Sequence, residues 1–469
     1  MRALLAVTSL LISTSLLLIG HGMQLTLLPL RGSLNGLSEF TIGMSASCYF
    51  LGFVAGCLVI PRIIAKVGHI RSFAVLAAIL TCALLTLEML DSWAAWLLLR
   101  FLTGAMICGL YTVIESWLND QATPESRGQV LAIYTFIVLM SMAVGQTMIT
   151  VGPPGSSTPF MLAAIFLALA IVPVGLTSRL APAPLESTRT RFSLLYRRSR
   201  SAFAGALVSG LVVGGFWSLG AVFAQRYSSS LSDVTWFITA AISGGALFQY
   251  PIGWLSDRVD RRLMMLALCV MGMVTSAAVA WSIGQPLHLA AVFMFGACTM
   301  PMYAISLAMA ADNSSSSEFV EIGTSVLMLN ALSAAVAPLL LGQIMTALNP
   351  AALFWASAVI CGVFAIYVGL QCTSRSKVTV EEQTPFSAAG MEAAPTSFDL
   401  DPRGLDDEIG DLVPQDSGTN PEEVEEEEEE EEEEELEEMS PGSEQASEVY
   451  PQYPDHTEQP NANGGRPLT

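Results

Sequence analysis

Apolar stretches dominate the chain up to residue 371. A scan for uninterrupted apolar runs of about 20 residues, the length that an α-helix needs to cross a bilayer, finds twelve, the first at 4–29 and the last at 351–371. Helices of soluble domains instead carry one apolar stripe that alternates with polar positions. The pattern therefore predicts an all-α membrane protein with twelve transmembrane helices.

One set of loops between these stretches carries most of the basic residues. The clusters at 62–71, 189–200 and 258–262 belong to this set, whereas the opposite set has little beyond Arg31 and Arg226. Loops rich in Lys and Arg stay on the cytoplasmic side of a membrane. Because an even number of spans returns the chain to the side where it began, we expect both termini to be cytoplasmic.

The longest loop between apolar stretches divides six spans from six. We expect an N-terminal half at 1–178, a basic cytoplasmic loop at 179–201 and a C-terminal half at 202–371. A shift of 192 residues lays AKVGHIR at 65–71 on DRVDRRL at 257–263. Internal repeats of this kind predict two pseudo-symmetric six-helix halves.

Residues 372–469 have a different composition. They hold 29 of the 42 acidic residues and only 4 of the 21 basic residues, and Glu425–Glu435 is an unbroken glutamate run, so the net charge of −21 belongs to this segment. Such a segment cannot bury enough apolar surface to offset the entropy lost on ordering. We predict a disordered acidic cytoplasmic tail, which either is simply solvated or binds a basic partner or cations.

The most specific motif is GWLSDRVDRR, at the cytoplasmic end of the eighth predicted span. Gly253 would let neighbouring helices approach closely, and Asp257 can accept hydrogen bonds from neighbouring arginines. Arg258, Arg261 and Arg262 are expected to stay on the cytoplasmic face. Plain topology would explain these arginines, but not the glycine and the aspartate at their spacing.

This motif resembles the G-x-L-a-D-R-x-G-R-R signature of the major facilitator superfamily, which lies between paired helices in each half. The resemblance implies that the cluster sets the balance between inward-open and outward-open states. The first-half copy, PRIIAKVGHIR, is degraded, with Ala65 at the position of the signature's aspartate. Whether Glu115 or Asp120 supplies the missing acid is an open question. The other gating candidates of this copy are Lys66, Gly68 and Arg71.

The fourth predicted span has a charge near each end, Arg100 and Glu115, and no charge between them. Fifteen residues of α-helix cover roughly 22 Å and return to nearly the same face, which also carries Gly104 and Tyr111. A charge inside a span costs on the order of 3 kcal/mol, so both charges are expected to line a wet cavity or meet a partner. The alternative is that each side chain snorkels to its nearest membrane interface.

The same span carries a second resemblance. Arg100 with Gly104 resembles the superfamily's R-x-x-x-G pattern, and the stretch GLYTVIESWLNDQATPESRGQVLAIYTF resembles the uncharacterised bacterial YcaD-like branch. The resemblance covers residues 1–371. It implies a secondary transporter of the bacterial cytoplasmic membrane that works by alternating access, and it names no substrate.

Other polar residues within the predicted spans are candidates for the substrate cavity. His21 could titrate near neutral pH and carry a coupled proton, although a lone helical histidine is more often a packed, hydrogen-bonded residue. Trp217 could stack on an organic substrate or belong to the aromatic belt at a membrane interface. The other cavity candidates are Gln24, Gln249 and Asn330.

The sequence carries no motif of an enzyme or of an ATP-driven pump. GxxxxGK[ST], HExxH and GxSxG are absent, and the eight cysteines lack the spacing of a metal site or a disulfide framework. We expect no cofactor, no metal, no catalytic residue and no nucleic-acid partner. The expected partners of a monomer are the lipid bilayer, a small-molecule substrate and protons.

The predicted function is secondary active transport of a small organic solute, coupled to an ion, with a proton as the default, and running as efflux or metabolite exchange. The alternative from another class is a non-transporting membrane sensor or scaffold that uses the same fold. Sequence alone does not separate efflux from exchange, because neither direction has a residue signature in these spans.

Overall fold

The computed structural model describes residues 2–90, 92–122, 127–153, 155–176, 190–228, 230–374, 383–384, 386, 394–398 and 401. The chain divides into two units, Met1–Gly410 and Asp411–Thr469, and every described residue belongs to the first. The predictions for the glutamate run and for residues 179–189 of the basic loop therefore lie outside the described residues.

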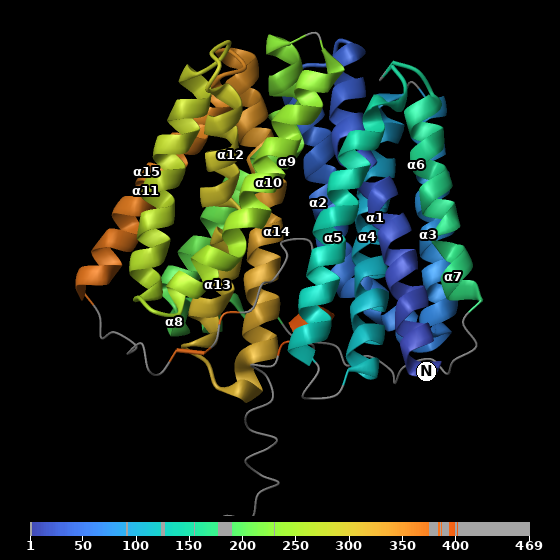
Figure 1. Ribbon diagram of the computed structural model, residues 1–469, viewed down its shortest axis with the longest axis horizontal. Helices are drawn as coiled ribbons and strands as arrows, with labels where there is room; N and C mark the ends of the chain where they lie inside the picture. The colour runs from blue at the N-terminus through green and yellow to red at the C-terminus, as the bar shows by residue number, and fades with distance from the viewer. Residues whose placement is uncertain are drawn as a thin grey trace, which may run out of the picture. The chain divides into compact units, whose positions relative to one another are not determined.

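Every regular element in the described part of the chain is a helix (Figure 1). In chain order the elements are α1 (Arg2–Leu34), α2 (Glu39–Val67), α3 (His69–Met89), α4 (Trp93–Gln121), α5 (Arg127–Met148), η1 (Ile149–Val151), α6 (Thr158–Leu169), α7 (Ile171–Gly175), α8 (Phe192–Arg198), α9 (Arg200–Tyr227), α10 (Leu231–Ser256), α11 (Arg261–Trp281), α12 (His288–Thr299), α13 (Met302–Ala311), α14 (Ser316–Ala347), α15 (Ala352–Ser374) and η3 (Pro395–Phe398).

Within these residues, twelve helical segments are long and apolar enough to cross a membrane, which confirms the predicted fold class. Two of the spans are interrupted: α6 and α7 form the sixth, and α12 and α13 form the tenth. The tenth span breaks at Pro301, because proline lacks the backbone N–H and its ring clashes with the preceding turn. The break lies beside Met300, which lines the pocket described below.

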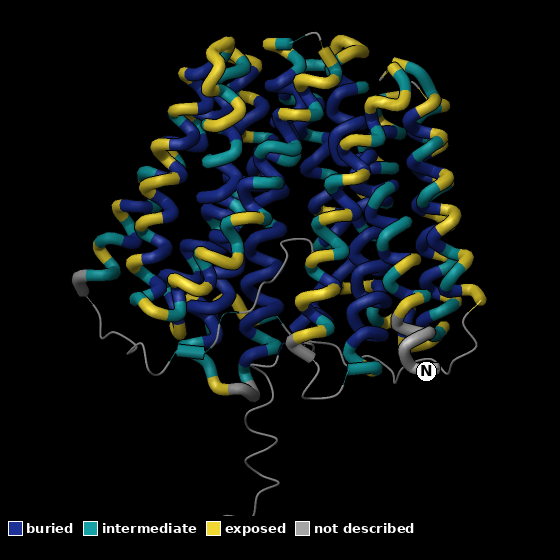
Figure 2. Tube along the Cα trace, viewed as in Figure 1, coloured by how far each residue is buried: buried dark blue, intermediate teal, exposed yellow. Residues whose placement is uncertain are grey.

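The outer helices present apolar side chains to their surroundings. On α15, Val359, Val363, Ile366 and Leu370 follow helical spacing and are all exposed. Figure 2 shows such exposed faces along the outer helices, with buried residues between them. An apolar stripe of this length is unfavourable in water and matches the interior of a bilayer. The exposed faces are therefore the lipid-facing faces of a multi-pass membrane protein.

Each half has its own hydrophobic core, one built mainly from α1 to α7 and the other mainly from α9 to α15. A Cβ on Gly52 would overlap the backbone of α4, and a Cβ on Gly104 would overlap the backbone of α2, so these two helices pack backbone to backbone. Gly244 and Gly296 play the same part between α10 and α12. The two pairs are 192 residues apart, which is the shift found in the sequence.

The two halves meet at one end of the bundle. Glu39, at the start of α2, pairs with Arg226, at the end of α9, with 2.8 Å between a carboxylate oxygen and a guanidinium nitrogen. The hydroxyl of Thr346 on α14 donates to the other Glu39 oxygen. We call this end the opposite face. The end where α1 begins, marked N in Figure 1, is the basic face.

The described part of the predicted basic loop lies at the basic face and holds α8. Arg198, at the end of α8, pairs with Glu318 of α14 at 2.8 Å, and Arg191 pairs with Glu321 of the same helix at 3.4 Å. These are half-exposed ion pairs, each contributing about 0–1 kcal/mol. They fix the short helix against the second half.

Candidate functional site

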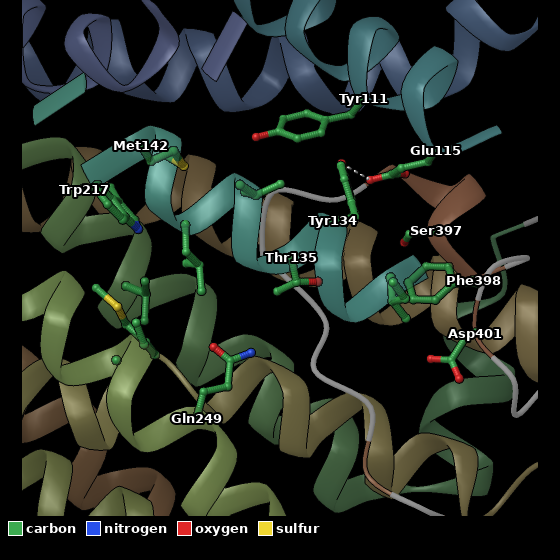
Figure 3. A pocket seen from close by; sticks show the side chains of 17 residues that line it. Tyr111, Glu115, Tyr134, Thr135, Met142, Trp217, Gln249, Ser397, Phe398 and Asp401 are labelled. Atoms are coloured by element: carbon green, nitrogen blue, oxygen red, sulfur yellow. Dashed lines mark hydrogen bonds between the residues drawn. The ribbon is translucent and has the colours of Figure 1, made fainter. Parts of the chain in front are cut away.

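A pocket lies between the two halves and draws its walls from both. About 1000 Å³ of space that no protein atom fills lies within its bounds, open solvent at its mouth included. Figure 3 shows side chains from α4 and α5 on one side and from α9 and α10 on the other pointing into it. The residues that define its chemistry are Tyr111, Glu115, Tyr134, Trp217, Gln249 and Met300.

Glu115 is the one acidic residue that a membrane helix contributes to this lining. Its side chain is fully buried, and the hydroxyl of Tyr134 donates to one carboxylate oxygen at 3.1 Å. The backbone N–H of Ala394 donates to the other oxygen at 2.9 Å, and the hydroxyl of Thr396 donates to it at 3.2 Å. These three partners are neutral donors. A carboxylate that lines a pocket can also accept hydrogen bonds from a cationic or donating group that enters it.

The rest of the lining is mostly aromatic and aliphatic. Tyr111, Trp217 and Met142 point into the pocket in Figure 3, and Met300 reaches it from the break in the tenth span. Gln249 is the main polar group on the second-half wall. An apolar cavity with a few placed polar groups is typical of sites that bind organic solutes.

The structure brings three of the sequence candidates together in this pocket and leaves the others elsewhere. Tyr111, Glu115 and Gln249 line it. Asn330 instead donates its side-chain N–H to the carbonyl of Ala206 at 3.2 Å, which joins α14 to α9. Gly104 lies in the contact between α2 and α4 described above and does not line the pocket.

Arg100 belongs to a second polar cluster, nearer the opposite face. Its side chain is 3% exposed, and its guanidinium carbon lies 4.6 Å from the centre of the Tyr49 ring. The Tyr49 hydroxyl is 3.2 Å from Nε2 of His21. Burial places Arg100 inside the bundle, so snorkelling does not describe it. Within the described residues, two of its nitrogens and the side-chain amide of Gln24 have no hydrogen-bond partner.

Arg100 and Glu115 therefore serve different places in the bundle, although both lie on α4. Arg100 borders a smaller pocket with Trp96 and Ser45, between α1, α2 and α4. A buried guanidinium with free donors is costly unless an anion or water reaches it. The single charged path predicted along this helix is divided in this conformation.

At the basic face the signature motif forms a buried ion cluster around Arg261. Its guanidinium binds the carboxylate of Asp312 and, at 2.7 Å, that of Asp257, and it donates to the carbonyl of Ala308 at 3.2 Å. Burial raises the pKa of the Asp312 carboxyl above its ordinary value, while Arg261 and the donors of Thr384 lower it. Arg258 lies apart from this cluster, with its guanidinium carbon 3.8 Å from the centre of the Trp254 ring.

The first-half copy is built differently. The positions 192 residues before Asp257, Arg261 and Asp312 are Ala65, His69 and Asp120. His69 is buried, and its Nε2 lies 3.0 Å from the hydroxyl of Ser116. Asp120 is exposed and accepts a hydrogen bond from the side chain of Gln121. At the position of the ion cluster, this half has a histidine–serine contact.

The basic side chains of this copy are solvated, and its glycine ends a helix. Lys66 and Arg71 are exposed. Gly68 follows α2 with a φ of +89°, a conformation that favours glycine, and its N–H donates to the carbonyl of Ile64. Glu115 was one of the two candidates for the acid that the first-half motif lacks. Its carboxylate contacts Tyr134 and the tail, as described above.

The predicted disordered tail is not uniform. The described tail residues Gln383, Thr384, Phe386, 394–398 and Asp401 belong to it, and Ser397, Phe398 and Asp401 line the pocket. The prediction of a disordered tail concerns mainly residues outside the described part of the chain, whereas these described residues contact the bundle. Two phenylalanine rings lie against the bundle at Gly253 and Gly323, and backbone N–H groups donate to the carboxylates of Glu115 and Asp257.

Sequence reasoning missed the α5 wall of the pocket. Tyr134, Val138 and Met142 follow one another at four-residue spacing and all line it. The spacing is visible in the sequence, but it marks one helical face without saying whether that face meets lipid, a neighbouring helix or a pocket. Tyr134 and Thr135 are the polar residues that α5 contributes to this lining.

These features define a membrane transporter built from two six-helix halves around a central pocket. The chain belongs to the major facilitator superfamily, whose sequence model matches residues 10–225 and again residues 202–398. Membership indicates transport across the membrane and not catalysis.

The chain is similar to uncharacterised bacterial members of this family. It is 26% identical over 368 residues to an uncharacterised MFS-type transporter of Yersinia enterocolitica, covering 77% of this chain and 93% of the relative. It is also 26% identical over 324 residues to the uncharacterised MFS-type transporter YcaD of Escherichia fergusonii, covering 67% and 82%. The resemblance to the YcaD-like branch is confirmed.

Solved transporter structures share the fold. The nucleoside transporter NupG matches with a TM-score of 0.67 at 12% identity, covering 79% of this chain and all of that chain (100%). An inward-facing bacterial homologue of the human lysosomal transporter Spinster matches with a TM-score of 0.64 at 15% identity, covering 82% and 98%. At these identities the likeness establishes the fold alone.

Proposed function

We propose that the protein moves a small organic solute across a bacterial cytoplasmic membrane by alternating access, with its basic face and both termini in the cytoplasm. The observation that carries this proposal is the pocket between the halves, which takes its walls from both and lies on the basic side of the Glu39–Arg226 pair. Rocking of the halves about such a pocket would expose it to either side in turn. The basic loops support the orientation.

The lining suggests the chemistry of the solute. Tyr111 and Trp217 offer flat surfaces, Met142 and Met300 offer adaptable apolar ones, and Glu115 offers a buried carboxylate. A solute with an aromatic or apolar body and one cationic or hydrogen-bond-donating group fits these walls. Nucleosides, the solutes of the fold neighbour NupG, belong in a test panel together with amines and drug-like cations.

Coupling to protons is assigned to Glu115. The oxygens of a carboxylate that faces the pocket can either bind a proton or accept a hydrogen bond from the solute. Binding of the solute therefore displaces the proton, and protonation displaces the solute. His21, the other titratable candidate, lies against Tyr49 in the second polar cluster and does not line this pocket. Solute binding and deprotonation of Glu115 then favour each other.

The test is solute-driven proton movement in proteoliposomes that contain a trapped pH-sensitive dye. The full chain and a version that ends at residue 375 are both assayed with nucleosides, sugars, amino acids, amines and cationic drugs. We expect at least one solute to drive proton flux in the wild type, and we expect Glu115→Gln to abolish the proton movement and to weaken binding of that solute. Flux without proton movement would remove the coupling. No solute-dependent flux by either version would favour the sensor or scaffold alternative.

A further inference from the structure

Nine described residues between 383 and 401 lie against both halves of the bundle at the basic face. They come from a segment beyond the last membrane helix, and none of them is needed to complete a span. Their hydrogen bonds to carboxylates and to Arg261 fall on two places already described, the Arg261 cluster of the second half and Glu115 of the first half.

The first anchor is on the second half. The backbone N–H and the hydroxyl of Thr384 both donate to Asp312 at 3.0 Å, and its carbonyl accepts from Arg261. The N–H of Phe386 donates to Asp257 at 3.3 Å. Its ring occupies the space beside Gly253, where any Cβ would collide with it. The signature glycine thus makes room for a tail phenylalanine, whereas the sequence predicted a close approach of helices there.

The second anchor reaches the pocket itself. Ala394 and Thr396 supply two of the donors that hold the Glu115 carboxylate. Pro395–Phe398 forms the short helix η3, all of whose residues are buried. Phe398 meets the ring of Phe319 on α14 edge to face, with 6.2 Å between ring centres, and lies over Gly323. Figure 3 shows Ser397 and Phe398 beside Glu115 at the mouth of the pocket.

These two anchors have a common consequence. The segment binds one half through Asp312 and Asp257 and the other through Glu115, so it bridges the opening between them. In alternating access the halves must approach each other at this face before the pocket can open on the opposite side. A bridging segment prevents that approach, and it occupies the acid that a solute would need.

We propose that the nine described residues between 383 and 401 are a tethered occupant of the pocket mouth, which competes with solute for Glu115 and holds the transporter open at the basic face. The proposal rests on the proposed function. Because the segment is attached nine residues after α15 ends at Ser374, its effective concentration at the mouth is high, and modest contacts suffice to keep it in place. Release of the segment then precedes each transport cycle.

Docking is tested without any transport assay. Benzoylphenylalanine is placed at position 398 of the full chain, and its photo-cross-links are mapped by mass spectrometry. We expect cross-links to α14 around Phe319 and Gly323 in native membranes. We expect fewer of them in the double variant Thr384→Val with Phe386→Ala, which removes the hydroxyl and the ring of the first anchor. Cross-links spread over the chain would overturn the docking, and cross-links to α14 that the two substitutions leave unchanged would overturn the role of the first anchor.

Inhibition by the segment is tested with two deletions, one of the segment and one of the chain that follows it. One removes residues 383–401 and keeps the acidic remainder, and the matched control removes 402–469 and keeps the segment. If the segment occupies the pocket for two-thirds of the time, its deletion raises solute flux about threefold, while the control leaves flux unchanged. A synthetic peptide of residues 383–401, added to the deletion variant, should lower flux again.

The outcomes separate this inference from the proposed function. Mapped cross-links combined with equal flux in both deletions would overturn the competition with solute and leave transport standing. A flux gain in the control and none in the segment deletion would assign regulation to the acidic run and overturn the inference. Absence of flux in every version would remove the proposed function, and the cross-links would still decide whether the segment docks.

Discussion

Replacing Arg261 with glutamine is expected to be the most damaging single change in the ion cluster at the basic face. Arg261 is 2% exposed, and its guanidinium binds Asp312, whose side chain is 4% exposed. Removing one partner of a buried ion pair leaves the other charge buried and uncompensated, which costs about 3–5 kcal/mol. We therefore expect Arg261→Gln to lower the free energy of unfolding by about 3–5 kcal/mol.

Asp257 provides the matched control. It pairs with the same arginine at 2.7 Å, but its side chain is 34% exposed. Water screens such a pair, so Asp257→Asn should lower the free energy of unfolding by only about 0–1 kcal/mol. In the double variant Arg261→Gln with Asp312→Asn no charge is stranded, and about 1–3 kcal/mol of the loss should be recovered.

The assay is reversible unfolding of the purified protein in mixed micelles with increasing SDS, followed by tryptophan fluorescence. The four proteins are compared under one set of conditions, so that differences in unfolding free energy and not absolute values are interpreted. Equal losses in Arg261→Gln and Asp257→Asn, or no recovery in the double variant, would refute the reasoning that burial of Asp312 decides the size of the effect.

Three further predictions concern α4 and the tail. Arg100→Lys should lower transport at least severalfold, because lysine keeps the charge but loses the planar stacking on Tyr49, and wild-type kinetics would remove Arg100 from function. Gly104→Ala should strongly reduce the yield of monodisperse protein on size-exclusion chromatography, since its Cβ would overlap the α2 backbone, whereas Gly175→Ala, which meets open space, should leave the yield unchanged. Truncation after residue 401 should leave membrane abundance within about twofold, measured by immunoblot, and loss of insertion would show that the acidic remainder supports folding.

The spans and their pairing could be predicted because the bilayer imposes simple rules on sequence. A helix that crosses it needs a long apolar run, and basic loops remain on one side. The 192-residue shift was visible in the signature motif, and the glycine pairs that repeat it in space, such as Gly52 with Gly244, obey the same shift. Backbone contact between helices requires a small residue at a fixed position, so the repeat survives there.

The role of Arg261 within the signature could not be singled out in the same way. Three arginines follow Asp257 closely and look equivalent in a loop. In the structure α10 ends at Ser256 and α11 begins at Arg261. The Arg261 side chain therefore pairs with Asp257, four residues earlier, while Arg258 lies over Trp254. Which arginine turns inward depends on where α10 ends and α11 begins, and sequence does not define that boundary to one residue.

The pocket was predicted only where polarity marks it. Glu115, Tyr111 and Gln249 stand out because they are polar within apolar spans. Met142 and Met300 do not, because an apolar residue that faces a pocket looks the same as one that faces lipid. Tertiary packing alone distinguishes the two environments.

The docked tail residues were missed because composition was averaged over the whole tail. Residues 383–398 contain a single acid, Glu392, together with Phe386 and Phe398, whereas most of the acids lie further on. Two phenylalanines in a stretch of low charge indicate a segment that can pack against the bundle. The composition of this stretch alone, apart from the acidic remainder, carries that signal. Its partners, Gly253 and Gly323, are far away in sequence and could not be named without the structure.

The central claim, that one pocket is reached from both sides of the membrane in turn, is tested most directly by labelling a cysteine at Thr135. This half-buried residue lines the pocket. A membrane-impermeant thiol reagent is applied to right-side-out and inside-out vesicles, and protein that retains Thr135 reports the background from native cysteines. The account predicts labelling from the cytoplasmic side, and labelling from outside that rises when Glu39→Gln breaks the pair with Arg226. Labelling from one side only, with and without Glu39→Gln, would contradict alternating access.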